Sequence, residues 1–122
     1  MVNLDADILI HALDGSLTQR EKRVLKGDAD WGISAIVLWE IEKLYAKGRI
    51  RFGLETPELT GALAHLHVWP ISAEVCLNLR RLDFTSDPAD ELIAATSLTY
   101  SVPLVTRDRK IRMTALFPCV GD

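Results

Sequence analysis

Short apolar runs alternate along this chain with longer segments in which apolar residues recur every three or four positions. The short runs predict buried strands, at 2–4, 31–33, 67–71, 103–106 and 117–120. The longer segments have the period of helices. Strands and helices that alternate in this way predict an α/β fold, with a parallel sheet covered by helices on both faces.

Most of the predicted helices begin with a residue that can cap free backbone N–H groups. Thr18 and Glu21 have the spacing of a capping box, which opens a polar helix that closes at Gly27-Asp28. The other predicted helices are 8–13 after a cap at Asp7, 35–47 after Ser34, 57–66 after Thr56, 73–82 after Ser72, and a short one that contains Ile111.

The segment 87–100 is a well-marked helix with one unexpected feature. Asp87 is a good N-cap, Pro88 suits the first helical position, and acidic residues follow in the first turn. Helical spacing places Asp90 on the same face as Ile93 and Ser97, which suggests a packed face. A carboxylate there is costly unless a partner compensates it.

Glu40 repeats this pattern in the helix predicted at 35–47. It lies one turn from Ile36, Val37 and Leu44, on the side of the helix that is expected to be buried. An apolar residue would be expected at this position. Trp39, its neighbour, is interpreted as a packing residue rather than a platform for stacking bases.

Composition indicates one globular domain, spanning 1–122, with 48% apolar and 25% charged residues. No apolar run is long enough for a membrane span, and the N-terminus lacks the pattern of a secretory signal, so we expect a cytoplasmic protein. Cys76 is expected in the core, and the two cysteines suggest neither a zinc site nor a disulfide framework. The net charge of −3 argues weakly against simple electrostatic binding of nucleic acid.

Four carboxylates from distant segments are expected to meet in one pocket. Asp5 and Asp108 follow predicted strands, whose carboxyl ends carry the ligand sites of open α/β sheets. Glu40 and Asp90 lie on helices that begin at that same edge. Such a cluster needs a counter-charge, and oxygen ligands suit Mg²⁺ or Mn²⁺. A cation held there can activate water for attack on a phosphodiester.

Simpler interpretations stay open for several of these residues. Asp5 and Asp108 could be ordinary caps, Asp87 is primarily a cap and secondarily a ligand, and Asp7 is either a cap or an extra ligand. Thr106 either bonds to the backbone or supports the attacking water. His11, His65 and His67 have no metal-binding spacing.

Four motifs in this order resemble those of a PIN domain, and among PIN domains the VapC-like toxin ribonucleases of prokaryotic toxin–antitoxin pairs. They are LDADILI at 4–10, ISAIVLWEI at 33–41, DPADELIAAT at 87–96 and PLVTRD at 103–108. The resemblance implies a three-layer α/β/α sandwich and Mg²⁺- or Mn²⁺-dependent endoribonuclease activity. It also implies an antitoxin partner and a homodimer.

The resemblance assigns the catalytic and metal-binding roles to Asp5, Glu40, Asp90 and Asp108, with Thr106 in support. Two positions depart from the family pattern and make the pocket edge more acidic. Asp7 stands where a neutral polar residue is frequent, and Glu91 stands where relatives often carry arginine. The basic residues that adjoin Asp108 are expected to contact RNA phosphates; they are Arg107, Arg109, Lys110 and Arg112.

Three other functions fit the sequence less well. A PIN nuclease of RNA processing or decay would have the same residues without being a toxin. A receiver-type signalling domain would need a phosphoacceptor aspartate after a central strand, but Ile33 is followed by Ser34. A PIN fold used only for binding would not need all four carboxylates.

Overall fold

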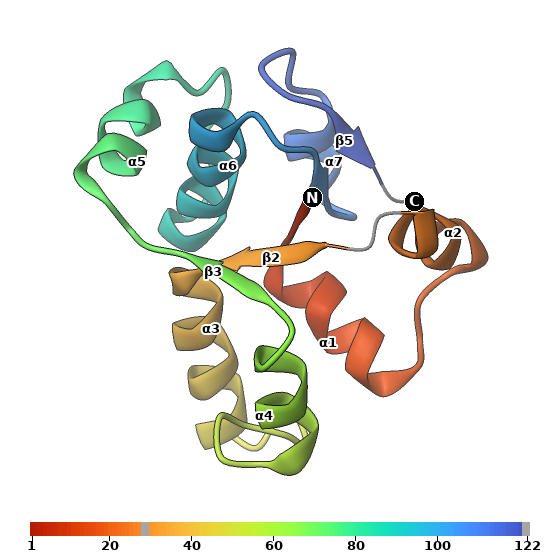
Figure 1. Cartoon of the computed structure of the whole chain (residues 1–122). Coiled ribbons are helices and arrows are strands. Elements are labelled where there is room, and N and C mark those ends of the chain that lie inside the picture. The colour runs from red at the N-terminus through yellow and green to blue at the C-terminus, as the bar shows by residue number, and fades with distance from the viewer. Residues whose placement is uncertain (28–29, 121–122) are drawn as a thin grey trace.

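The computed structural model describes residues 1–27 and 30–120, so the helix end predicted at Gly27-Asp28 lies partly outside them. In this part of the chain five parallel strands form one sheet in the order β3-β2-β1-β4-β5 (Figure 1). The strands are β1 (Val2–Leu4), β2 (Trp31–Ser34), β3 (His67–Trp69), β4 (Leu104–Val105) and β5 (Cys119–Val120). The prediction of a parallel α/β sheet is confirmed.

The first strand of the chain lies in the middle of the sheet. Asn3 of β1 is in register with Gly32 of β2 on one side and with Leu104 of β4 on the other. The chain builds β1, β2 and β3 outward in one direction and then returns to add β4 on the free side of β1. The carboxyl ends of β1 and β4 therefore flank the point where the strand order reverses, which is where open sheets bind ligands.

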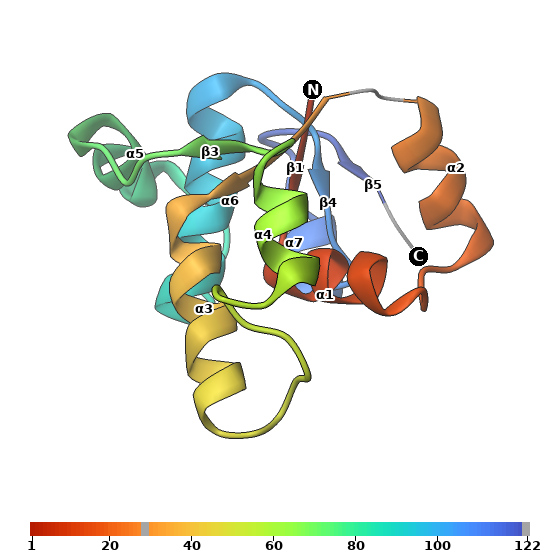
Figure 2. The same ribbon diagram turned by 60° about the horizontal axis from the view of Figure 1, so that its bottom comes forward.

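Helices cover both faces of the sheet. Because crossovers between parallel strands are right-handed, the helices before β3 and those after it fall on opposite faces. Figure 2 shows α1 and α4 on one side of the strands and α6 and α7 on the other. The helices are α1 (Ala6–Asp14), α2 (Gln19–Gly27), α3 (Ala35–Ala46), α4 (Pro57–Leu63), α5 (Ala73–Asn78), the 3-10 turn η1 (Leu79–Arg81), α6 (Pro88–Tyr100) and α7 (Arg109–Arg112).

Local signals positioned most of these helices correctly. The Thr18 hydroxyl accepts from the Glu21 N–H at 3.1 Å while Glu21 Oε1 accepts from the Thr18 N–H at 2.9 Å, which is the predicted capping box. Ser34 and Ser72 also cap as expected. The cap of α1 was assigned to Asp7, two residues too late, with Asp5 as an open alternative: the Asp5 side chain accepts the hydrogen bond from the Ile8 N–H. An aspartate directly after a strand can serve as cap, so the helix begins sooner.

Two predictions about packing were wrong. Cys76 is exposed on α5, because only Val75 of that short helix is buried. Trp39 is 53% exposed on α3, so it does not pack into the core. Within the described residues, no helix has the length and apolar character needed to cross a membrane.

Candidate functional site

Asp5 lies directly after β1, at the centre of the sheet edge. Its carboxylate is buried, accepts a hydrogen bond from the Ile8 N–H at 2.8 Å and contacts the Thr106 hydroxyl. Burial raises the pKa of Asp5 to about 6, since the two hydrogen bonds only partly offset the loss of water. Asp5 is therefore both a helix cap and a carboxyl group held at the edge of the sheet.

Asp108 occupies the matching place after β4. Its Oδ1 accepts from the Ile111 N–H at 3.1 Å and so caps α7. Its own N–H donates to the Thr106 hydroxyl at 3.1 Å. Thr106, which is fully buried, thus touches both Asp5 and Asp108 and fixes the two strand ends relative to each other.

Asp90 is held at the start of α6 by the loop before it. Asp87 caps the helix by accepting from the Asp90 N–H at 2.9 Å, and the Ser86 hydroxyl donates to Asp90 Oδ2 at 3.2 Å. Glu91, which departs from the family pattern, accepts from the Ser86 N–H at 3.1 Å. Burial, followed by the charge of Asp87, raises the pKa of Asp90 to about 6.

The face of α6 below Asp90 is packed, as its sequence indicated. Ile93, Ala94 and Ser97 are all buried. Asn3, in the middle of β1, is also buried and donates from Nδ2 to the Ile93 carbonyl at 3.1 Å and the Ser97 hydroxyl at 3.0 Å. These two bonds tie α6 to the central strand. The sequence analysis did not identify Asn3, although a polar residue within a three-residue apolar strand was a visible signal.

Glu40 projects from the second turn of α3 and is half-buried. Its Oε1 is buried and has no hydrogen-bond partner among residues 1–27 and 30–120. Burial raises the pKa of Glu40 to about 7, and the charges of Asp90, Asp87 and Asp5 add to the effect. An acceptor that is buried without a donor is costly to the fold, so a role in binding would account for it.

The charges of the four carboxylates influence one another, and we refer to Asp5, Glu40, Asp90 and Asp108 together as the carboxylate ring. The charge of Asp108 raises the pKa of both Asp5 and Asp90, and the charges of Asp90 and Asp5 raise that of Glu40. The chain thus brings together four acidic residues from the ends of β1 and β4 and from α3 and α6, and among the described residues none of them forms an ion pair. Their mutual repulsion would be relieved by a cation.

The chemistry of this ring suits a divalent cation, although its side chains do not already form a binding cage. All four groups offer hard oxygen ligands, which Mg²⁺ and Mn²⁺ prefer, and Glu40 supplies an unpartnered oxygen. Within the described residues, no three acidic, histidine or cysteine side chains stand close enough to hold one ion together. The residue types therefore fit a divalent metal ion.

The remaining predicted residues divide between the site and the fold. Asp7 is exposed, and its Oδ1 lies 3.5 Å from His11 Nε2. Arg107 donates from Nε to Glu21 Oε2 at 2.7 Å, so its guanidinium is engaged in the fold. Lys110 donates to the Thr85 carbonyl at 2.9 Å, and Arg109 is exposed beside Asp108. Arg112 is half-buried.

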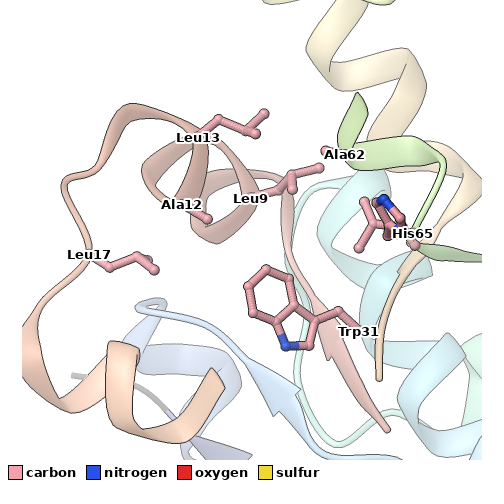
Figure 3. A pocket seen from close by; sticks show the side chains of 8 residues that line it. Leu9, Ala12, Leu13, Leu17, Trp31, Ala62 and His65 are labelled. Atoms are coloured by element: carbon pink, nitrogen blue, oxygen red, sulfur yellow. The ribbon is translucent and has the colours of Figure 1, made fainter. Parts of the chain in front are cut away.

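An apolar cavity of about 370 Å³ lies apart from these carboxylates, between α1, the start of β2 and α4 (Figure 3). Leucine and alanine side chains line most of it, and Trp31 and His65 complete the wall. None of its lining residues is one of the four acids.

Comparison with known proteins identifies the family. The PIN domain model matches residues 2–116, so the chain belongs to the PIN domain family, as its motifs indicated. No curated protein sequence shows a significant match.

Solved structures share the fold at low sequence identity. A chain of VapBC2 from Rickettsia felis, bound to a DNA fragment from their promoter, superposes with a TM-score of 0.77 at 19% identity, covering 98% of both chains. A toxin–antitoxin complex from Klebsiella pneumoniae gives 0.70 at 21%, covering 94% of this chain and 92% of that one. FitAcB from Neisseria gonorrhoeae gives 0.67 at 20%, with 99% and 97% covered.

Proposed function

We propose that this protein is a metal-dependent endoribonuclease that hydrolyses RNA phosphodiester bonds. The carboxylate ring of Asp5, Glu40, Asp90 and Asp108 at the point where the strand order reverses carries the proposal. Four repelling carboxylates that form no ion pair with residues 1–27 and 30–120 destabilise a fold, and they have the chemistry of a cation site. Membership of the PIN domain family supports the same function.

The four acids would hold Mg²⁺ or Mn²⁺. When bound there, such a cation would supply positive charge for the phosphodiester undergoing displacement and would make water a better nucleophile. The chain's own residues set the geometry: Thr106 holds Asp5 and Asp108 at adjacent strand ends, and Asp87 with Ser86 orients Asp90. Asp7 is exposed beside the start of α1, so it is at most a peripheral contributor.

Arg109 is the best placed of the four basic residues around Asp108 to contact RNA. It is exposed at the start of α7, next to the carboxylate ring. Arg107 is already paired with a carboxylate, and Lys110 is bonded to a backbone carbonyl. Contacts of this kind position the RNA backbone and weaken as salt rises.

We infer that the nuclease is the toxin of a toxin–antitoxin pair and acts as a homodimer. The solved structures with this fold include DNA-bound VapBC from Salmonella typhimurium and a toxin–antitoxin complex from Klebsiella pneumoniae. The apolar cavity between α1 and α4 is a suitable surface for an antitoxin segment. Coexpression with a small protein encoded directly upstream should give a stable complex in which RNA cleavage is suppressed.

The decisive test of the nuclease is cleavage of a mixed RNA pool with Mg²⁺, with Mn²⁺ and with chelator. Cleavage should require the cation and should be lost in Asp5→Asn and Asp90→Asn. Glu55→Asn, a change at an exposed turn position, is the matched control and should cleave normally. Cleavage that survives either site variant would exclude the proposed centre, and cleavage without antitoxin suppression would favour the processing nuclease.

A further inference from the structure

The exposed face of α3 next to Glu40 carries an aromatic and two lysines around a shallow groove. The groove has a volume of about 230 Å³ and is lined by Trp39, Glu40, Lys43, Leu44 and Lys47. Helical spacing places these residues along one side of α3, over two turns. Figures 1 and 2 both show α3 leaving the end of β2 and running away from the sheet. The groove therefore leads outward from the carboxylate ring.

Trp39 is the unusual member of this groove. Its indole is 53% exposed, although burying a tryptophan is one of the larger apolar gains available to a fold. The Lys43 ammonium lies over one face of the ring, 4.7 Å from its centre. A base would therefore stack on the opposite face of the indole, with the cation close by for an adjoining phosphate.

The lysines supply charge of the right sign for a nucleic-acid backbone. Lys43 and Lys47 are one turn apart and both are exposed. Neither forms an ion pair within residues 1–27 and 30–120. The carboxylate ring next to them would repel RNA, so the positive charge of this face is needed to bring a strand to Glu40.

We propose that this groove is a binding subsite for single-stranded RNA, in which a base stacks on Trp39 and adjacent phosphates contact Lys43 and Lys47. The proposal rests on the ribonuclease function proposed above and adds where the strand next to the cleaved bond lies. Single-stranded RNA fits better than a duplex, because stacking on an exposed indole requires an unpaired base. Because the site would contact only RNA phosphates and the face of a base, it would not by itself select an RNA sequence.

Binding of a fluorescent single-stranded oligoribonucleotide, measured in chelator, tests the subsite without cleavage. Trp39→Ala should weaken binding about tenfold, the loss expected for one stacked base. Trp39→Phe should restore most of it. Replacing Lys43 and Lys47 together with Ala should reduce the slope of log K against log salt by about 1.4, or about 0.7 per phosphate. Lys26→Ala, a change at an exposed position on α2, should alter neither quantity.

Three outcomes would overturn the subsite. If the wild type cleaves RNA but the Trp39 and lysine variants bind like the wild type, the strand runs elsewhere and the nuclease stands. If the wild type neither binds nor cleaves RNA, both proposals fail. If Trp39→Ala instead changes the oligomeric state on gel filtration, the face is an interface between protein chains.

Discussion

Arg107 and Glu21 form a two-pronged ion pair that joins the start of α2 to the end of β4. Arg107 Nε donates to Glu21 Oε2 at 2.7 Å, and Nη2 donates to Oε1 at 2.8 Å. The Glu21 side chain has no exposed surface, while that of Arg107 is 30% exposed. Arg107 stands between Thr106 and Asp108, so this pair anchors α2 to the strand end that carries the candidate site.

Glu21→Gln is expected to lower the free energy of unfolding by about 2–3 kcal/mol at pH 7, because the charge-assisted pair is lost in a buried setting. The Arg107 guanidinium lowers the pKa of Glu21 to about 2 from 4.5. Its stabilisation is therefore complete above about pH 4.5 and is lost as the pH falls toward 2. Urea unfolding should show a large difference from wild type at pH 7 and a small one near pH 2.5.

The control for this pair is Glu55→Gln, at an exposed turn position. It should leave stability within about 0.5 kcal/mol of wild type at both pH values. Arg107→Lys keeps the charge but loses the planar fork, so it should recover only part of the stability. A Glu21→Gln variant as stable as wild type at pH 7 would show that the pair is dispensable.

Glu40→Gln should stabilise the metal-free protein at pH 8. Burial and neighbouring charges raise the pKa of Glu40 to about 7, so ionising Glu40 costs free energy in the folded state. The penalty grows as the pH rises from about 4.5 through 7. We expect a gain of about 1 kcal/mol at pH 8 that disappears near pH 4.5. Thermal melts in chelator at the two pH values measure this gain, and a loss of stability at pH 8 would mark Glu40 as structural.

Two substitutions at Asp5 separate its role as a helix cap from the effect of its negative charge. Asp5→Asn retains an oxygen for the Ile8 N–H, so stability without metal should be kept or raised, while cleavage is abolished. Asp5→Ala loses the cap as well and should cost about 1 kcal/mol more. The two variants are compared by chemical unfolding and by RNA cleavage. Equal stability of the two would mean that the cap contributes nothing measurable.

Asn3→Ala should loosen α6 and lower activity without touching the site. The substitution removes the donor to the Ile93 carbonyl and the Ser97 hydroxyl, which is expected to cost about 2 kcal/mol. Amide hydrogen exchange in α6 should accelerate more than in α4. Asn78→Ala, which removes a bond to Thr99, is the control for α6 packing and should leave cleavage unchanged. Unchanged exchange in α6 for Asn3→Ala would contradict the anchoring role.

The sequence predicted features that depend on neighbours along the chain. The alternation of strands and helices, the capping box at Thr18 and the packed face of α6 were all recoverable, since each rests on spacing within one segment. Glu40 could be recognised as a candidate site residue because it interrupts the apolar side of the helix predicted at 35–47. Strand ends and helix starts grouped the four acids in one pocket, and the family resemblance then gave them a role in catalysis, which stays a prediction.

The features that the sequence did not predict depend on contacts between distant segments. Glu21 was identified only as a member of the capping box, and nothing near it in the chain indicates that Arg107, 86 residues later, would pair with it. Trp39 looked like a core residue by type alone, but its side of α3 faces solvent. The cap at Asp5 stayed one of two alternatives because Asp5 and Asp7 both had suitable side chains, and only the position where β1 ends decides between them.

The position of β1 in the middle of the sheet has a consequence for how the protein is made. A ribosome delivers β1 first, yet one of its two neighbours, β4, begins at Leu104. Asp108, the last of the four acids, follows still later. Since domains form as the chain emerges from its N-terminus, an unfinished chain would have three acids and an unpaired side of its central strand. A product that ends before Asp108 would therefore lack one of the four acids of the proposed centre.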